Sequence, residues 1–74
     1  MSIDVELFGQ LMSNKQRHQT LEIASPTLIR EVVNRLGLKE DEIGLITVDG
    51  VQSEPEDLVR PGSRVCFFPP MSGG

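Results

Sequence analysis

Residues 28–37, Leu28-Ile29-Arg30-Glu31-Val32-Val33-Asn34-Arg35-Leu36-Gly37, carry the one clear helical pattern of the chain. Apolar side chains recur there at the spacing of a single helix face, at Leu28, Ile29, Val32, Val33 and Leu36. The preceding Ser25-Pro26-Thr27 predicts the helix start, because a hydroxyl can cap free amides and proline fits the first turn. Either hydroxyl could be the cap, and Gly37 predicts a left-handed stop at the other end.

Strand patterns lie on both sides of this helix. Alternating apolar and polar residues predict a first strand from residue 3 to about 8 and a second from about 18 to 23. The β-branched residues of 43–48 predict a third strand, and Asp49-Gly50 predicts a tight hairpin into a short fourth. A turn at Pro61-Gly62 then leads into a last strand, from 63 to 68.

These elements predict an α+β fold with the order ββαβ(β)β. A single helix covers one face of a mixed sheet of four to five strands, which is the β-grasp (ubiquitin-like) arrangement. The parallel placement of the last strand beside the first is a prediction of topology. A chain of 74 residues has room for one modest core, so we expect one domain at 1–68 and a flexible C-terminal tail at 69–74.

Composition argues against several classes of function. The net charge of -4 disfavours nucleic acid, which needs a basic surface. Apolar runs are far too short to span a membrane, and the N-terminus has no signal-like pattern, so we expect a cytoplasmic protein. Cys66 stands alone and can form neither an internal disulfide nor a structural zinc site, and no metal site is expected.

The C-terminal residues form a tail with few means of packing. Pro69 and Pro70 offer no amide donors, so we expect them to leave the sheet as a stiff stem that continues through Met71 and Ser72. Gly73 and Gly74 lack Cβ atoms and could enter a channel too narrow for side chains. The terminal carboxyl on Gly74 is then the candidate reactive group. It needs activation by a partner, because the chain has no phosphate-binding loop.

The stretch from Phe67 to Gly74, with its Phe-Phe-Pro-Pro and Gly-Gly pairs, resembles the C-terminus of the MoaD/ThiS family of ubiquitin-like sulfur carriers. Its Phe-Phe-Pro-Pro form is most similar to the molybdopterin synthase small subunits of that family. Weaker similarities lie at Leu7-Phe8-Gly9-Gln10, at Pro26-Thr27 and in the segment 58–65, so the resemblance spans nearly the whole chain.

This resemblance implies a sulfur carrier of molybdenum cofactor biosynthesis. An E1-like adenylyltransferase of the MoeB/ThiF type would use ATP to adenylylate Gly74, and a sulfurtransferase would supply the sulfur of a thiocarboxylate. The large synthase subunit, of the MoaE type, would hold the catalytic residues, and this chain would bind no cofactor itself. The alternatives are a carrier for thiamine thiazole synthesis, a protein modifier joined to lysines, or a non-covalent binding module.

Other candidate residues carry weaker signals. Phe8 and Phe68 are predicted to point to the open side of the sheet, where they could form a partner-docking surface. Coverage of both rings by loops or by the stem is an equally open interpretation. For Cys66, for His18 and for the acidic run 40–42, we favour a bystander thiol, a solvated imidazole and a solvated loop over chemistry.

Overall fold

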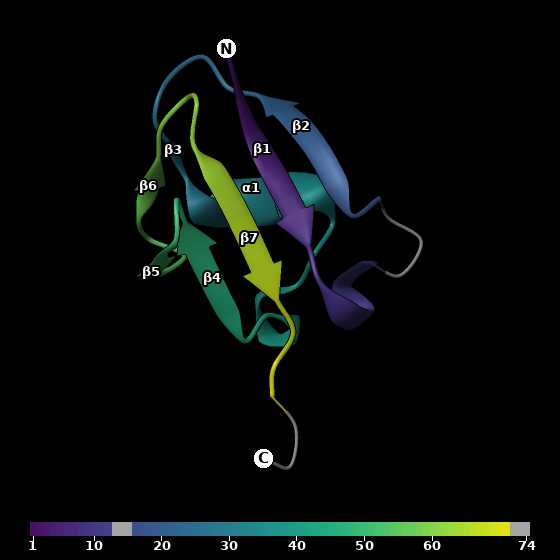
Figure 1. The fold of residues 1–74 in the computed structure, drawn as a ribbon. Helices are drawn as coiled ribbons and strands as arrows, with labels where there is room; N and C mark the ends of the chain where they lie inside the picture. Colours follow the sequence, from purple (N-terminus) through teal and green to yellow (C-terminus); the bar gives the residue numbers. More distant parts are fainter. Residues whose placement is uncertain (13–15, 72–74) are drawn as a thin grey trace.

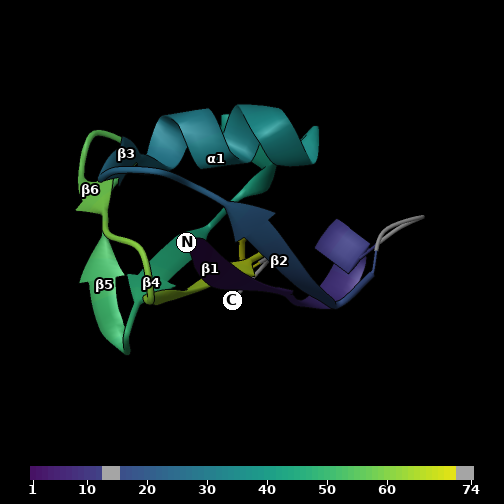
Figure 2. The ribbon, with the colours of Figure 1, turned by 90° about the horizontal axis from the view of Figure 1, so that it is seen from above.

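The computed structural model describes residues 1–12 and 16–71 of the chain. Five strands form a mixed sheet in the order β2-β1-β7-β4-β5, and helix α1 (Ile29–Leu36) crosses one of its faces (Figures 1 and 2). The strands are β1 (Ser2–Leu7), β2 (His18–Glu22), β4 (Leu45–Val48), β5 (Val51–Ser53) and β7 (Arg64–Phe68). The predicted β-grasp fold is therefore confirmed.

The last strand lies in the middle of this sheet. β7 pairs in parallel with β1, where Val5 lies opposite Val65 and Leu7 opposite Phe67. On its other side β7 pairs antiparallel with β4, where Ile46 lies opposite Phe67. The predicted parallel pairing of the first and last strands is thus confirmed, and the tail continues from a central strand (Figure 1).

The face covered by the helix, here called the closed face, holds the core. Side chains at alternate positions of β1, β4 and β7 meet the apolar stripe of α1, as the strand and helix periodicities predict. The buried apolar residues are Ile3, Val5, Leu7, Leu11, Ile23, Ile29, Val32, Val33, Leu36, Leu38, Ile46, Val59, Val65 and Phe67. The opposite face, here called the open face, carries the intervening side chains.

The start of the helix corrects the sequence-based prediction. α1 begins at Ile29, and no side chain caps it. Carbonyl groups of a distant loop accept its first amides instead: Ile29 N–H donates to Asp57 O at 2.9 Å, and Arg30 N–H donates to Pro55 O at 2.9 Å. Neither candidate hydroxyl is needed once these backbone acceptors are in place.

Leu28 also lies outside the helix. It belongs to β3 (Thr27–Leu28), which pairs with β6 (Leu58–Val59) in a second, two-stranded sheet. Its side chain is exposed, although the sequence pattern assigned it to the apolar stripe. The pairing with β6 holds residues 27–28 extended and sets where the helix can begin.

The predicted turns are present. Gly37 has φ 75° and ends α1, and Leu38 N–H donates back to Val33 O at 3.1 Å. Asp49 and Gly50 have φ values of 51° and 84°, as a two-residue hairpin of this hand requires. Two short 3-10 helices, η1 (Gly9–Met12) and η2 (Glu40–Glu42), complete the described elements. Within residues 1–12 and 16–71, no helix is long and apolar enough to cross a membrane.

Candidate functional site

The stem of the tail leaves the sheet at the end of β7. Gly44 N–H donates to Phe68 O at 2.8 Å, which is the last hydrogen bond of this strand edge before the prolines. Pro69 is half-buried and Pro70 is exposed, and Met71 stands free with 93% of its surface exposed. The predicted site residues Ser72, Gly73 and Gly74 lie outside the described residues.

Phe8 and Phe68 meet on the open face, where β1 and β7 end side by side. Their rings stack with centroids 4.5 Å apart and planes 9° apart. Both side chains are half-buried, because each ring covers the other and the Arg17 guanidinium lies 5.0 Å from the Phe8 centroid. Leu45 of β4 lies opposite Phe68 of β7, and its side chain is also partly exposed. These three residues, Phe8, Phe68 and Leu45, are called the open-face patch below.

The predicted orientation of the two aromatic residues is therefore what the structure shows. Phe68 ends β7, the strand from which the stem departs, and Phe8 directly follows the neighbouring strand β1. The two rings cover each other, and Arg17, from the segment before β2, lies over Phe8. Their role in docking a partner stays a prediction.

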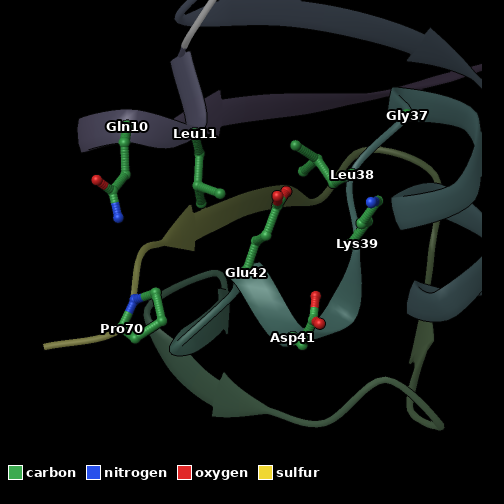
Figure 3. Close-up of a pocket in the computed structure, with 8 residues that line it drawn as sticks. All are labelled: Gln10, Leu11, Gly37, Leu38, Lys39, Asp41, Glu42 and Pro70. Atoms are coloured by element: carbon green, nitrogen blue, oxygen red, sulfur yellow. The ribbon is translucent and has the colours of Figure 1, made fainter. Parts of the chain in front are cut away.

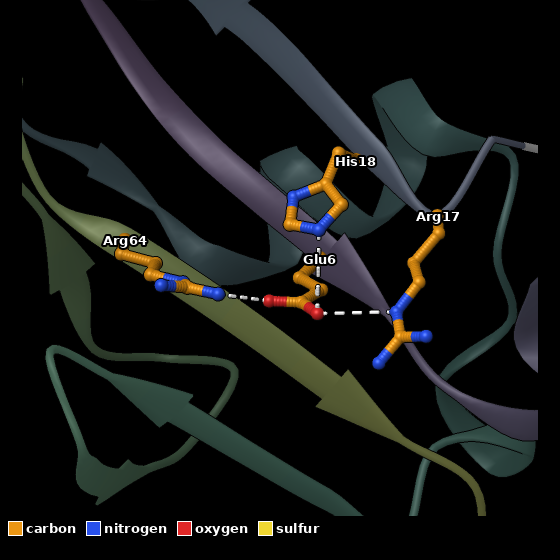
Figure 4. A network of polar contacts seen from close by, with 4 residues as sticks. All are labelled: Glu6, Arg17, His18 and Arg64. Carbon is orange, nitrogen blue, oxygen red and sulfur yellow. Dashed lines mark hydrogen bonds and ion pairs between the residues drawn. The ribbon is translucent and has the colours of Figure 1, made fainter.

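A buried carboxylate lies next to this patch on the open face. Glu6 of β1 is covered by three basic side chains rather than by the interior (Figure 4). Arg17 Nε donates to its Oε2 at 3.2 Å, His18 Nε2 lies 3.5 Å from the same oxygen, and Arg64 donates to Oε1. Glu6, Arg17, His18 and Arg64 are called the Glu6 cluster below.

Charges in the Glu6 cluster stabilise one another. The hydrogen bond from Arg64 lowers the pKa of Glu6, and Arg17 and His18 act in the same direction against the opposing effect of desolvation. The pKa of Arg64 is correspondingly raised by its hydrogen bond to Glu6. The cluster ties β1, β7 and the start of β2 together on the face that the helix does not cover.

Sequence reasoning missed this cluster. The alternation placed Glu6 on the polar side of β1, but the pairing of Glu6 with His18 and with Cys66 depends on the register of three strands. Cys66 lies half-buried between Glu6 and Thr47 in this register. The sequence shows only that Glu6 occupies a polar position of its strand, as Asp4 does.

The acidic run 40–42 lies near the stem, on the other side of the tail's exit. Glu40 binds Arg30 with Oε2 2.7 Å from Nε. Asp41 and Glu42 line an open hollow together with Leu38 and Pro70 (Figure 3). Among the described residues, no group of three or more His, Cys, Asp or Glu side chains is placed to hold a metal ion.

The fold and the stem together define a class of protein. A β-grasp domain in which no helix of residues 1–12 and 16–71 covers the second sheet face, with a C-terminal stem beside that face, has the ubiquitin-like fold. The chain belongs to the ThiS family, whose family model matches residues 5–74. No curated protein sequence matches it significantly.

Solved structures with the same fold come from several organisms. SAMP1 from Haloferax volcanii has 18% identity and a TM-score of 0.77, with 100% of both chains covered. Urm1 from Trypanosoma brucei has 24% identity and a TM-score of 0.72, with 99% of this chain and 95% of Urm1 covered. A chain from the complex of subunits 1 and 2 of the molybdopterin-converting factor from Helicobacter pylori has 19% identity and a TM-score of 0.64, with 100% of both chains covered. At these identities the similarity shows the fold.

Proposed function

We propose that this chain is a sulfur carrier of the cytoplasm that carries sulfur as a thiocarboxylate on Gly74. A free carboxylate is resonance-stabilised and unreactive, so the reaction requires a leaving group. An E1-like adenylyltransferase of the MoeB/ThiF type supplies it by forming an acyl-adenylate with ATP. A persulfide on a sulfurtransferase then attacks the acyl carbon and displaces AMP, and a thiol reductant cleaves the resulting acyl disulfide to leave the thiocarboxylate.

The exit of the stem from the middle of the sheet is the observation that carries this proposal. β7 is held on both sides by β1 and β4, so the position of Phe68 is fixed by the core. The stem starts from this fixed point, and Met71 already stands clear of the body. A partner that docks on the body therefore finds the start of the stem at a defined distance from its own active site.

The open-face patch supports a protein partner for the second half of the reaction. We propose the large subunit of molybdopterin synthase, of the MoaE type, as the acceptor complex. The Phe-Phe-Pro-Pro stem and the Helicobacter pylori complex of related fold support this choice. Transfer to a thiamine thiazole precursor uses the same carrier chemistry and is the alternative acceptor pathway.

Mass spectrometry tests the carrier function. The protein is produced together with its native activating enzyme and a sulfurtransferase, and the intact mass is measured. We expect the increase that corresponds to exchange of one terminal oxygen for sulfur, confined to the C-terminal peptide. A variant without Gly73 and Gly74 is the control and should stay unmodified. An unmodified wild-type protein, beside an enzyme that loads another carrier in the same assay, would contradict the proposal.

Protein modification is a second candidate, because a solved neighbour is itself named a small archaeal modifier protein. The same acyl-adenylate can react with a lysine amine instead of sulfur. Modification would give conjugates that survive denaturing gels and that disappear in the variant without Gly73 and Gly74. Thiocarboxylate without such conjugates would favour the carrier function.

A further inference from the structure

Gly44 lies against the backbone of the stem. It comes just before β4, the strand that flanks β7 on one side. A Cβ atom at this position would lie 2.5 Å from Pro70 Cα and 2.8 Å from both Pro69 O and Pro70 N. No real Cβ contact is that short, and the obstructing atoms are backbone atoms that cannot rotate away. The described path of the stem therefore requires a residue without a side chain at position 44.

Gly9 lies against the stem from the other side. It follows β1, the strand that flanks β7 opposite β4. A Cβ atom on Gly9 would lie 2.8 Å from Pro69 Cγ. Its φ of 59° also favours glycine, so two separate features restrict this position. The stem thus passes between two glycines. Gly9 follows β1 and Gly44 precedes β4, the two strands that neighbour β7.

The two prolines make such contacts necessary. Neither proline has an amide hydrogen, so the stem cannot continue the hydrogen bonding that holds β7 in the sheet. Close packing against the bare Cα atoms of the two glycines is a contact that can fix its direction without an amide donor. Gly44 matters most here, because its φ lies outside the left-handed region and only the approach of the stem excludes a side chain.

We propose that Gly44 and Gly9 are positioning residues that set the direction in which the tail leaves the body. This inference rests on the proposed carrier function and adds a requirement to it. The partner's active site needs Gly74 at one place relative to the docked body. A change in the stem's direction moves the reacting carboxyl without altering the docking surface.

A comparison of Gly44→Ala with Gly50→Ala separates an effect on the direction of the stem from an effect on the stability of the fold. A Cβ on Gly50 meets no atom within 4 Å, but its φ of 84° makes alanine strained there. We therefore expect Gly50→Ala to lower the melting temperature by about 4–8 °C and to leave sulfur loading unchanged. We expect Gly44→Ala to lower the melting temperature less, because a displaced stem relieves its contact.

The kinetics of adenylylation and sulfur loading by the native activating enzyme are then measured for both variants. For Gly44→Ala we expect kcat to fall roughly 10- to 100-fold, since small misplacements of reacting groups have effects of that size. KM should stay within about twofold, because the docking surface is intact. Loading of Gly44→Ala within about threefold of wild type, or an equal loss in Gly50→Ala, would overturn the proposal.

A second set of variants tests Gly9. It still tests whether a glycine beside β7 positions the stem if Gly44→Ala does not fold. Gly9→Ala introduces a contact with the Pro69 ring, and Pro69→Ala removes that ring. We expect Gly9→Ala to lower kcat, and the double variant to recover the kcat of Pro69→Ala alone. Strictly additive losses would show that Gly9 does not act through the stem and would overturn its role.

The wild-type measurement distinguishes the two proposals. Wild-type protein that is never loaded by a competent enzyme contradicts the carrier function itself. Wild-type protein that is loaded, together with a fully active Gly44→Ala, leaves the carrier function standing and removes only the positioning role.

Discussion

The closed and open faces of the sheet differ in what their side chains do, and neighbouring residues of β7 show this most clearly. Phe67 points into the closed face and is fully buried among core residues. Phe68 points to the open face, where its ring stacks on Phe8 and keeps some contact with solvent. One strand therefore provides a central core residue and a surface residue next to the departing stem. This separation predicts that substitutions on the two faces affect different measurements.

The largest expected effect is on stability at Phe67. Phe67→Ala should lower the free energy of unfolding by about 3–5 kcal/mol, because it removes a fully buried ring and leaves a cavity. Phe68→Ala should lower it by only about 1–2 kcal/mol, because it removes a half-buried ring and its stack on Phe8. Urea denaturation of both variants measures the difference. Equal losses would contradict the division of the two faces.

The second effect, on partner binding, follows from the proposed docking role. Phe68→Ala should weaken binding to the large synthase subunit by about 2 kcal/mol, or roughly thirtyfold, as removal of an aromatic anchor does. Val51 of the edge strand β5 is also exposed but lies outside the open-face patch, so Val51→Ala should bind normally. Titration calorimetry measures both. If Phe68→Ala bound with unchanged affinity, the open-face patch would not be part of the interface.

The third effect concerns the helix that covers the closed face. Asp57 accepts a hydrogen bond from Glu54 N–H at 2.8 Å and so fixes the turn whose carbonyls cap α1. Asp57→Ala should lower the free energy of unfolding by about 1 kcal/mol, as loss of a cap does. Thr27→Ala should change it by less than about 0.5 kcal/mol, because Thr27 does not cap the helix. Urea denaturation measures both changes. A larger loss of stability in Thr27→Ala than in Asp57→Ala would support capping by a side-chain hydroxyl.

The smallest expected effect is the pH dependence of the open face. The folded-state pKa of Glu6 lies below its ordinary value of 4.5, so the folded protein binds this proton less readily than the unfolded chain. Its stabilising contribution is therefore complete above about pH 4.5 and is lost as the pH falls through the lowered pKa. Glu6→Gln should be less stable than wild type at pH 7, and the two should converge as the pH falls below the lowered pKa of Glu6. Urea midpoints across this range test the convergence, and a constant difference would contradict it.

Most of the fold could be predicted because its signals are local. The alternation in β1, the stripe of α1 and the Asp49-Gly50 hairpin each depend on residues that lie close together in the sequence. The helix cap was predicted wrongly because its acceptors, the carbonyls of Pro55 and Asp57, lie far along the chain. Local hydroxyls were the only capping groups that a sequence pattern could show.

The candidate site was predictable to a smaller degree for the same reason. The orientations of Phe8 and Phe68 follow from the alternation of their own strands, so their shared face could be predicted. The packing of Gly44 and Gly9 against the stem depends on which strands flank β7, and nothing near Gly44 in the sequence indicates it. The predicted chemistry of Gly74 lies outside the described residues and stays a prediction.

The central place of β7 also has a consequence for protein synthesis. A chain that stops before residue 64 lacks the strand that joins β1 to β4, so each half of the sheet keeps an unpaired edge and the core cannot close. Ribosomes that terminate before residue 64 thus release products without a folded body to present to the activating enzyme. These products cannot act as decoys that show an intact surface but lack the terminus, because they stop before the strand that completes the sheet.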